Sequence, residues 1–443
     1  MEETDSPTSD PSSPPRSPIL PSAINEDEFP QKSTTQIPSE KEDSPLPSPR
    51  RTPSHPTTSS TTVTERKHVL RYDASWPIYG LDWSRRPSEQ EAWRLALGSL
   101  MEDCVNKLQV VTLPEYVASV EVHSSRGDFA VLAETDIGYP VTKVLWEPWK
   151  GGSSSTDLLA TTSDFVRIWE LGSSESEDNN LVGKGESAPR QSLGLKATLK
   201  NTKSDFSAPL TSIDWCESDP ALLVSSSIDT TCTLWNVETQ QTTIQLVAHE
   251  KEVYDVAFMP GSASIFATVG ADGTARLFDT RCLEQSRIIY SSPFSPVNAN
   301  SLPVIPGVSL LRLQFNKINA NLIATLHVAT NIVHVLDIRT SQPLVELRGH
   351  SSPVNAIGWA PHLSNLLVSG GDDSQVLVWD LDDPSSYAPH LPPGAPPPTA
   401  QKIVHHPILA YTADAEVNQL CWSGVMPDRM GISFGRRLQV LKI

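Results

Sequence analysis

The chain has 443 residues, 38% of them hydrophobic, with 11 tryptophans and a formal net charge of −18; this length suits one large domain or two to three ordinary ones. The acidic balance disfavours direct binding of nucleic acid, because such a surface repels the phosphate backbone. No apolar run approaches the length of a membrane-spanning helix, and the start MEETDSPTSDPSSPP lacks the basic and apolar regions of a secretory signal.

The first segment, residues 1–64, holds 13 of the 38 prolines and is dense in serine and threonine. It offers too little apolar surface to offset the entropy of ordering, so we predict a disordered tail. Serine or threonine precedes proline six times, as in proline-directed phosphorylation, although a tail of this composition would also produce such pairs by chance. The possible phosphorylation sites are Ser6, Ser13, Ser17, Ser44, Ser48 and Thr52.

Residues 65–443 alternate short β-rich runs with turns, and the runs repeat. One aromatic residue ends the first run of each repeat: Trp83, Trp146, Trp215, Phe258, Phe315, Trp359 and Trp422. A large apolar residue ends a later run, 19 to 28 residues further on: Val111, Trp169, Trp235, Phe278, Leu336, Trp379 and Leu441. Seven such pairs predict seven antiparallel units of about four strands, stacked radially with these residues in the cores between them. The predicted fold is an all-β, seven-bladed β-propeller.

The two ends of the repeat region complement each other. The chain stops at Ile443, just after Leu441, so the last unit is one strand short. The segment ERKHVLRYDA at 65–74 is predicted to supply that strand and to close the ring, because closure leaves no free sheet end. A simple extended lead-in is the alternative.

Two polar stretches interrupt the repeats. One covers about 172–205 and is rich in glycine and serine, and the other covers about 382–402 and is rich in proline. We predict that both are loop inserts that project from the ring.

An aspartate recurs six residues before the tryptophan of two units, as Asp229 with Trp235 and as Asp373 with Trp379. Aspartate favours tight turns, and it can also accept a hydrogen bond from an upstream histidine. We therefore predict a buried polar network within the blades, formed by His350, Ser369, Asp373 and Trp379, with Asp229, Trp235, His249 and Asp272 in related positions. In isolation this set resembles a Ser-His-Asp catalytic group, but the repeat favours the structural role.

The dipeptide Gly349-His350 followed by SGGDDSQVLVWD resembles the WD repeat. SSIDTTCTLWN, QLVAHEKEVYDVAF and GADGTARLFDTR resemble a narrower family of WD-repeat proteins. Over most of 66–443 the sequence resembles the WD-repeat regulators of plant trichomes and anthocyanins and their animal counterparts. These counterparts are cullin-four-associated factors that also act as adaptors for DYRK-type kinases. The resemblance implies a non-catalytic scaffold without cofactors that joins kinases, transcription regulators and ubiquitin-ligase parts in the nucleus and cytoplasm.

Two short segments, FDTR and LDIR, end the third strands of consecutive units. They resemble the W-D-x-R box by which many WD-repeat proteins dock on the cullin-four ligase adaptor, which assigns Asp279, Arg281, Asp337 and Arg339 to partner binding. Each aspartate could instead pair locally with its own arginine.

The preferred function is therefore a monomeric, non-catalytic protein scaffold, with a substrate receptor of a cullin-RING ubiquitin ligase as the first alternative. A propeller enzyme is the second alternative. It would need carboxylates or histidines that converge in the central channel, and the channel positions read as largely small or apolar. The five cysteines are scattered without a CxxC pair, which argues against a zinc site or a disulfide framework. We predict no metal site and no contact with nucleic acid or membrane.

Overall fold

A computed structural model describes residues 68–102, 104–117, 127–149, 151, 157–173, 191–200, 208–292, 308–382 and 402–443. These residues belong to a compact unit that spans Glu65–Ile443. The predicted disordered tail at 1–64 and its six phosphorylation sites lie outside the described residues. No helix within the described ranges has the length and apolar character needed to cross a bilayer.

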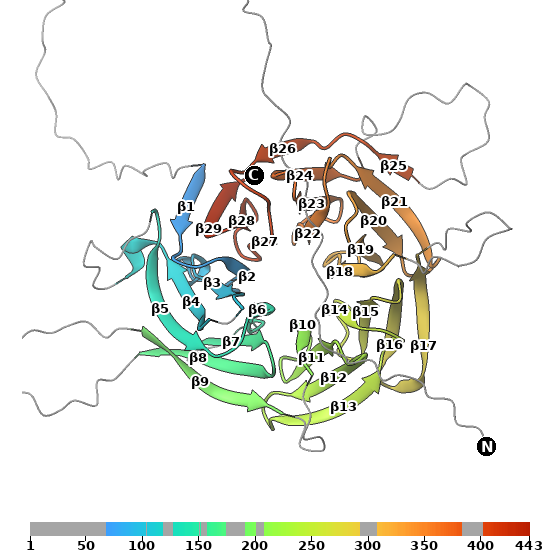
Figure 1. Cartoon of the computed structure of the whole chain (residues 1–443), viewed down its shortest axis with the longest axis horizontal. Coiled ribbons are helices and arrows are strands. Elements are labelled where there is room, and N and C mark those ends of the chain that lie inside the picture. The colour runs from blue at the N-terminus through green and yellow to red at the C-terminus, as the bar shows by residue number, and fades with distance from the viewer. Residues whose placement is uncertain are drawn as a thin grey trace, which may run out of the picture. The chain divides into compact units, whose positions relative to one another are not determined.

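Seven antiparallel sheets stand radially around a common centre (Figure 1). Blade 1 contains β2 (Ile78–Trp83), β3 (Leu95–Ser99), β4 (Asn106–Thr112) and β5 (Ala130–Ile137). Blade 2 contains β6 (Lys143–Trp146), β7 (Asp157–Thr162), β8 (Val166–Ser173) and β9 (Gln191–Leu199). Blade 3 contains β10 (Leu210–Trp215), β11 (Leu222–Ser227), β12 (Thr231–Asn236) and β13 (Gln241–Val247). Blade 4 contains β14 (Val253–Phe258), β15 (Ile265–Gly270), β16 (Thr274–Asp279) and β17 (Cys282–Ser291).

Blade 5 contains β18 (Leu310–Phe315), β19 (Leu322–His327), β20 (Ile332–Asp337) and β21 (Gln342–Arg348). Blade 6 contains β22 (Val354–Trp359), β23 (Leu366–Gly371), β24 (Gln375–Asp380) and β26 (Leu409–Thr412). Blade 7 contains β27 (Gln419–Trp422), β28 (Arg429–Phe434), β29 (Arg437–Lys442) and β1 (Val69–Asp73). A one-turn helix, α1 (Glu89–Ala92), and a 3-10 turn, η1 (Pro114–Tyr116), lie in connections of blade 1. The predicted seven-bladed propeller is confirmed.

The ring closes through its two ends, as predicted. β1 pairs antiparallel with β29, with Val69 opposite Leu441 and Asp73 opposite Arg437. Tyr72 of β1 is fully buried, and its hydroxyl donates a hydrogen bond to Gln109 Oε1 of blade 1 at 2.6 Å. The N-terminal strand therefore joins the last blade to the first.

The apolar cores lie between blades rather than within them. One core, for example, packs Leu145 and Ile168 of blade 2 against Trp215 and Trp235 of blade 3. The aromatic and large apolar residues that the repeat predicted for these cores are buried in every blade, except that Trp422 is only partly buried. An isolated blade would expose both of its apolar faces, so each blade depends on its neighbours.

The first predicted insert is too long. Gln191–Leu199 lies inside the range 172–205 but forms β9, the outer strand of blade 2. Leu193 and Ala197 are buried but Leu195 is exposed, because a β-bulge between Leu195 and Ala197 interrupts the alternation of the strand. The resulting weak alternation is easily mistaken for a polar loop.

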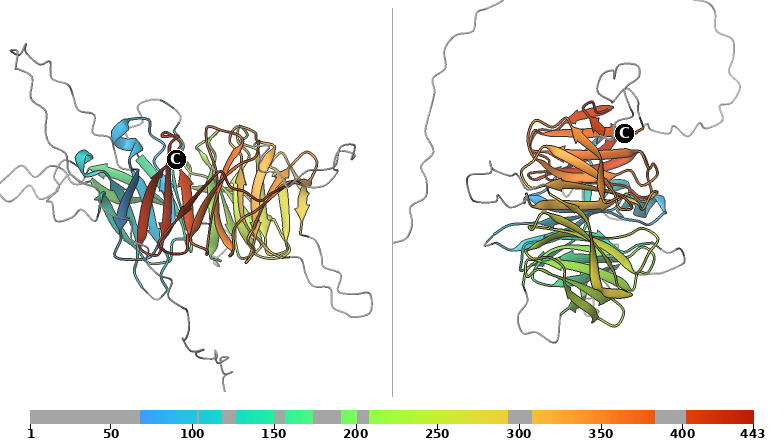
Figure 2. Two further views of the ribbon diagram at one scale, coloured as in Figure 1. Left: turned by 90° about the horizontal axis from the view of Figure 1, so that it is seen from above. Right: turned by 90° about the vertical axis from the view of Figure 1, so that its right-hand side faces the viewer.

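Most of the second predicted insert, residues 383–401, lies outside the described residues. β25 (Lys402–Val404) pairs in parallel with β21 at the outer edge of blade 5, and the chain then returns to blade 6 as β26. Blade 5 consequently has five strands. Figure 2 shows the ring edge-on, with the strands crossing from one face to the other.

Candidate functional site

In blades 3, 4 and 5 the turn after the first strand and the turn after the third strand lie on the same face of the ring. In blade 4 these turns are joined by a hydrogen bond from Thr280 N to Ser264 O, and in blade 5 by one from Ile338 N to Asn321 O. We call this side of the ring the turn face. It carries both segments that were predicted to bind a ligase adaptor.

The Asp-x-Arg segments of blades 4 and 5 adopt the same conformation. Arg281 donates hydrogen bonds from its backbone N and from Nε to Asp279 Oδ1 at 3.0 and 2.8 Å, and from Nη2 to Oδ2 at 2.6 Å. Arg339 makes the same three bonds to Asp337, at 2.9, 3.0 and 2.7 Å. The aspartate thus fixes the turn and the guanidinium together.

Both arginines remain open to a partner despite this local pairing. Their side chains are 70% exposed for Arg281 and 66% for Arg339. The hydrogen bonds from Arg281 lower the pKa of Asp279 to about 2, and those from Arg339 lower the pKa of Asp337. Local pairing and partner binding are therefore compatible, because the carboxylate orients a guanidinium that still faces solvent.

The equivalent turn of blade 6 has the opposite charge. Asp382 occupies the position of the arginine, and its backbone N donates to Asp380 Oδ1 at 2.9 Å. The backbone turn is the same in all three blades, so the side chain at this one position sets the charge that the turn face presents.

The polar network of blade 6 brings together four side chains. Trp379 Nε1 donates to Ser369 Oγ at 2.8 Å, and Ser369 Oγ lies 2.7 Å from His350 Nε2. His350 Nδ1 lies 3.0 Å from both oxygens of Asp373. An ionised Asp373 accepts the Nδ1 proton, so Nε2 is the acceptor for the Ser369 hydroxyl.

This network is closed to substrates, because Ser369 and Trp379 are fully buried. Burial lowers the pKa of His350. Burial also acts to raise the pKa of Asp373, but the hydrogen bonds from His350 and Ser351 outweigh it and the pKa is lowered. The arrangement holds the turn before β24 against the rest of the blade.

The related residues of the other blades form partial versions. In blade 4, His249 Nδ1 lies 2.9 Å from Asp272 Oδ1, and Nε2 lies 2.7 Å from Thr268 Oγ1. In blade 3 no histidine joins the pair: Asp229 accepts from Thr231, while Trp235 Nε1 donates separately to Ser225 Oγ at 2.9 Å.

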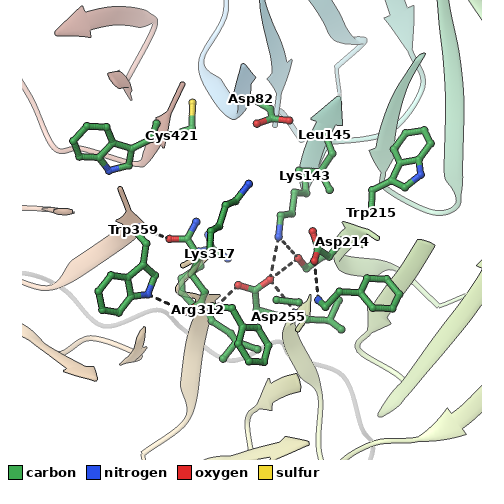
Figure 3. A pocket seen from close by; sticks show the side chains of 18 of the residues that line it. Asp82, Lys143, Leu145, Asp214, Trp215, Asp255, Arg312, Lys317, Trp359 and Cys421 are labelled. Atoms are coloured by element: carbon green, nitrogen blue, oxygen red, sulfur yellow. Dashed lines mark hydrogen bonds and ion pairs between the residues drawn. The ribbon is translucent and has the colours of Figure 1, made fainter. Parts of the chain in front are cut away.

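The central channel is charged, which corrects the prediction that its lining is small or apolar. It encloses about 250 Å³ and is lined mainly by the first strand of each blade (Figure 3). Its charged lining residues are Asp82, Arg85, Lys143, Asp214, Glu217, Asp255, Arg312 and Lys317. These residues occupy three recurring positions around the aromatic residue that ends each first strand. Lys143, Asp255 and Arg312 lie three residues before it, Asp82 and Asp214 lie one before it, and Arg85, Glu217 and Lys317 lie two after it. The prediction failed because small or apolar residues, such as Gly80 and Leu145, occupy the same positions in other blades.

Side-chain acceptors in the channel fasten four of the blades to the next one. Asp82 Oδ2 accepts from Trp146 N at 2.8 Å, and Asp214 Oδ2 accepts from Phe258 N at 2.7 Å. Further round the ring, Asp255 Oδ2 accepts from Leu313 N at 2.9 Å, and Gln314 Oε1 accepts from Trp359 N at 2.7 Å. Burial raises the pKa of Asp82, and it raises that of Asp214 to about 6.

Cations balance these carboxylates across the channel. Lys143 Nζ lies 3.3 Å from Asp255 Oδ1 and 2.9 Å from Ser212 Oγ, and Figure 3 shows Lys143, Asp214 and Asp255 pointing toward one another. At the mouth on the turn face, Glu217 Oε1 accepts from Arg85 at 3.0 Å and from Lys317 at 2.6 Å. Glu217 therefore links blades 1, 3 and 5 across the opening.

This chemistry suits a structural role. The channel carboxylates are bound by backbone N–H groups or by cations, and no group of three or more His, Cys, Asp or Glu within the described residues is arranged to hold a metal ion. A signal for Asp82 and Asp214 was present in the sequence, since each directly precedes the aromatic residue that ends its strand.

Comparison with known proteins places these features in a family. The family model described as "WD domain, G-beta repeat" matches residues 239–279 and 341–380. The chain is 42% identical over 380 residues to the "DDB1- and CUL4-associated factor 7 homolog" of Dictyostelium discoideum, covering 86% of this chain and 100% of the relative. It is 36% identical over 411 residues to an uncharacterized WD repeat-containing protein of Schizosaccharomyces pombe, covering 85% of this chain and 90% of that protein. A WD repeat-containing protein of Saccharomyces cerevisiae is 36% identical over 324 residues, covering 71% of this chain and 58% of that protein.

Proposed function

Because the chain belongs to the WD-repeat family that includes the DDB1- and CUL4-associated factor 7 homolog of Dictyostelium discoideum, we propose that it is a non-catalytic scaffold that serves as a substrate receptor of a cullin-RING ubiquitin ligase. In this role the turn face binds the cullin-four ligase adaptor, DDB1, and another part of the ring holds the protein to be modified.

The observation that carries this proposal is the pair of identical Asp-x-Arg turns on neighbouring blades. Arg281 and Arg339 are held by bidentate contacts from Asp279 and Asp337, yet both remain mostly exposed. A guanidinium that is already oriented loses less conformational entropy on binding than a free one. Two of them on one face form a rigid pair of donors for carboxylates or carbonyls of a partner.

The test is a binding measurement with purified DDB1 and the full chain. We expect Arg281→Ala combined with Arg339→Ala to weaken binding by about tenfold or more, as for a central interface arginine. Arg287→Ala combined with Arg348→Ala is the matched control, because these arginines are exposed on the outer strands of the same two blades. Equal affinity of the two double variants would discard the receptor role.

The scaffold proposal extends to a DYRK-type kinase and to transcription regulators as clients, in the nucleus and the cytoplasm. What supports it is the resemblance of the chain to adaptors of such kinases; the likeness to plant regulators stays a prediction. Affinity purification from native cells, followed by mass spectrometry, tests it. We expect a kinase to co-purify equally well with the wild type and with the Arg281 and Arg339 double variant, because the proposed kinase contact lies elsewhere on the ring.

An enzyme with a site in the channel is the competing function. The channel contains carboxylates, as such a site requires, but Asp82, Asp214 and Asp255 all accept backbone N–H groups from the next blade. Metal analysis of the purified full chain separates the two functions: stoichiometric metal would support an enzyme, and its absence together with client binding would support the scaffold.

A further inference from the structure

Two exposed aliphatic side chains lie on the turn face beside the Asp-x-Arg turn of blade 5. Ile318 is 59% exposed and Leu363 is 51% exposed. Ile318 belongs to the turn after β18, and Leu363 belongs to the turn after β22 of the next blade. Single exposed aliphatic residues are common on protein surfaces, so their placement relative to other groups is what matters here.

Hydrogen bonds tie these residues into one continuous surface. Asn316 Nδ2 donates to Ser364 O at 2.8 Å and joins the turn that carries Ile318 to the turn that carries Leu363. Ile338 N donates to Asn321 O at 2.9 Å and joins the Ile318 turn to the Asp337–Arg339 turn. The turns of Leu363 and Arg339 are therefore both bonded to the turn of Ile318, which lies between them.

The Ile318 turn is also rigid within itself. Asn316 Oδ1 accepts from Ile318 N at 3.0 Å and from Asn319 N at 2.9 Å. Its neighbour Lys317 is held at the channel mouth by Glu217. Because the backbone is fixed on both sides, Ile318 is presented at little entropic cost to a partner.

The charge on this surface differs from that of the chain as a whole. The protein carries a net charge of −18, whereas the charged side chains beside Ile318 are cations: Lys317 is its neighbour in the chain and is 40% exposed, and Arg339 lies on the turn bonded to it. The turn of Leu363 has one exposed acid beside it, because Leu381 N donates to Asn365 O at 2.9 Å and brings Asp382 close. A partner that fits presents carboxylates around an apolar depression. Oriented arginines next to buried apolar residues are typical of the centre of a protein interface.

We infer that Ile318 and Leu363, together with Arg339, form the apolar centre of the surface on which the ligase adaptor docks. This inference rests on the proposed receptor function and deepens it: the arginine pair orients the partner, and the aliphatic pair fills its depression and excludes water from the arginine contacts.

The test compares three double variants of the full chain in a binding titration with purified DDB1. Ile318→Ser combined with Leu363→Ser removes the aliphatic pair. Leu195→Ser combined with Val247→Ser is the matched control, since these residues are equally exposed but lie on the outer strands of blades 2 and 3. The third variant is the Arg281 and Arg339 pair. Thermal unfolding of each variant verifies that the ring is intact.

We expect the aliphatic pair to weaken binding by about tenfold or more, and the control pair to leave the affinity within about twofold of the wild type. If the arginine pair abolishes binding while the aliphatic pair does not weaken it, the inference is overturned and the receptor function stands. If the wild type does not bind DDB1 at all, the receptor function itself fails. An equal loss in the aliphatic and control pairs would also overturn the inference, because it would show a general loss of surface apolarity rather than a defined centre.

Discussion

Closure of the ring by its N-terminal strand predicts that a single residue of β1 controls the stability of the whole propeller. Tyr72 is fully buried and lies in the core between blades 7 and 1, with Leu70, Trp83 and Leu438. Its hydroxyl donates to Gln109 Oε1 at 2.6 Å. The perturbation is Tyr72→Ala, compared with Tyr72→Phe, which removes only the hydroxyl.

The structure sets the expected loss in free energy of unfolding for each of the two variants. Loss of a fully buried aromatic side chain costs about 3 to 5 kcal/mol, because transfer and cavity terms add. Loss of the hydroxyl alone leaves Gln109 Oε1 without this donor and costs about 1 to 2 kcal/mol. The expected order of stability is wild type, then Tyr72→Phe, then Tyr72→Ala.

The assay is urea unfolding followed by tryptophan fluorescence, since tryptophans lie in most of the cores between blades. Tyr139→Ala serves as the control, because Tyr139 is exposed between blades 1 and 2. A Tyr72→Ala midpoint equal to that of Tyr139→Ala would refute closure by β1 as a source of stability.

Three further predictions follow from buried polar groups. Burial raises the pKa of Asp214 to about 6, so its contribution to the free energy of unfolding is present at low pH and is lost as the pH rises through 6. Relative to Asp214→Asn, the wild type should gain up to about 3 kcal/mol of stability between pH 7.5 and pH 4 in denaturant titrations. Parallel plots of stability against pH for the two proteins would contradict this. Ser369→Ala strips partners from His350 and Trp379 and should cost about 2 to 4 kcal/mol in the same assay, whereas Ser369→Thr should cost less, because Thr268 has the equivalent role in blade 4; equal losses would contradict the network. Burial raises the pKa of Cys232 and Cys421, and a thiol reacts with iodoacetamide only as the thiolate. Mass spectrometry after brief treatment of the native protein should therefore find label on the exposed Cys104 and Cys282 first.

The channel explains why function could be read only partly from the sequence. Asp279 and Arg281 are two residues apart, so their local contact follows from the turn they share. Arg85 and Glu217 are 132 residues apart, and Lys143 and Asp255 are 112 apart. The two members of each pair occupy the same position of the repeat, but the repeat does not say which blades face each other, because these side chains meet only after the ring closes.

The aliphatic pair on the turn face shows the same limit. Nothing in the sequence distinguishes Ile318 and Leu363, because each is a single hydrophobic residue in a polar turn. Their importance comes from two side-chain and backbone bonds, Asn316 to Ser364 and Ile338 to Asn321, that place three turns side by side.

The sequence by itself determined the number of blades, the residues that end their strands, the strand that closes the ring and the Asp-x-Arg turns. The number of blades, the ends of the strands and the Asp-x-Arg turns depend on alternation and turn chemistry within about 30 residues, which the order of side chains encodes directly. The closing strand was predicted because the last unit lacks one strand. Only the tertiary structure decided which charged residues pair across the channel, that Gln191–Leu199 is a strand and that distant turns share one surface. Those outcomes depend on distances between residues of different blades, and radial closure sets these distances.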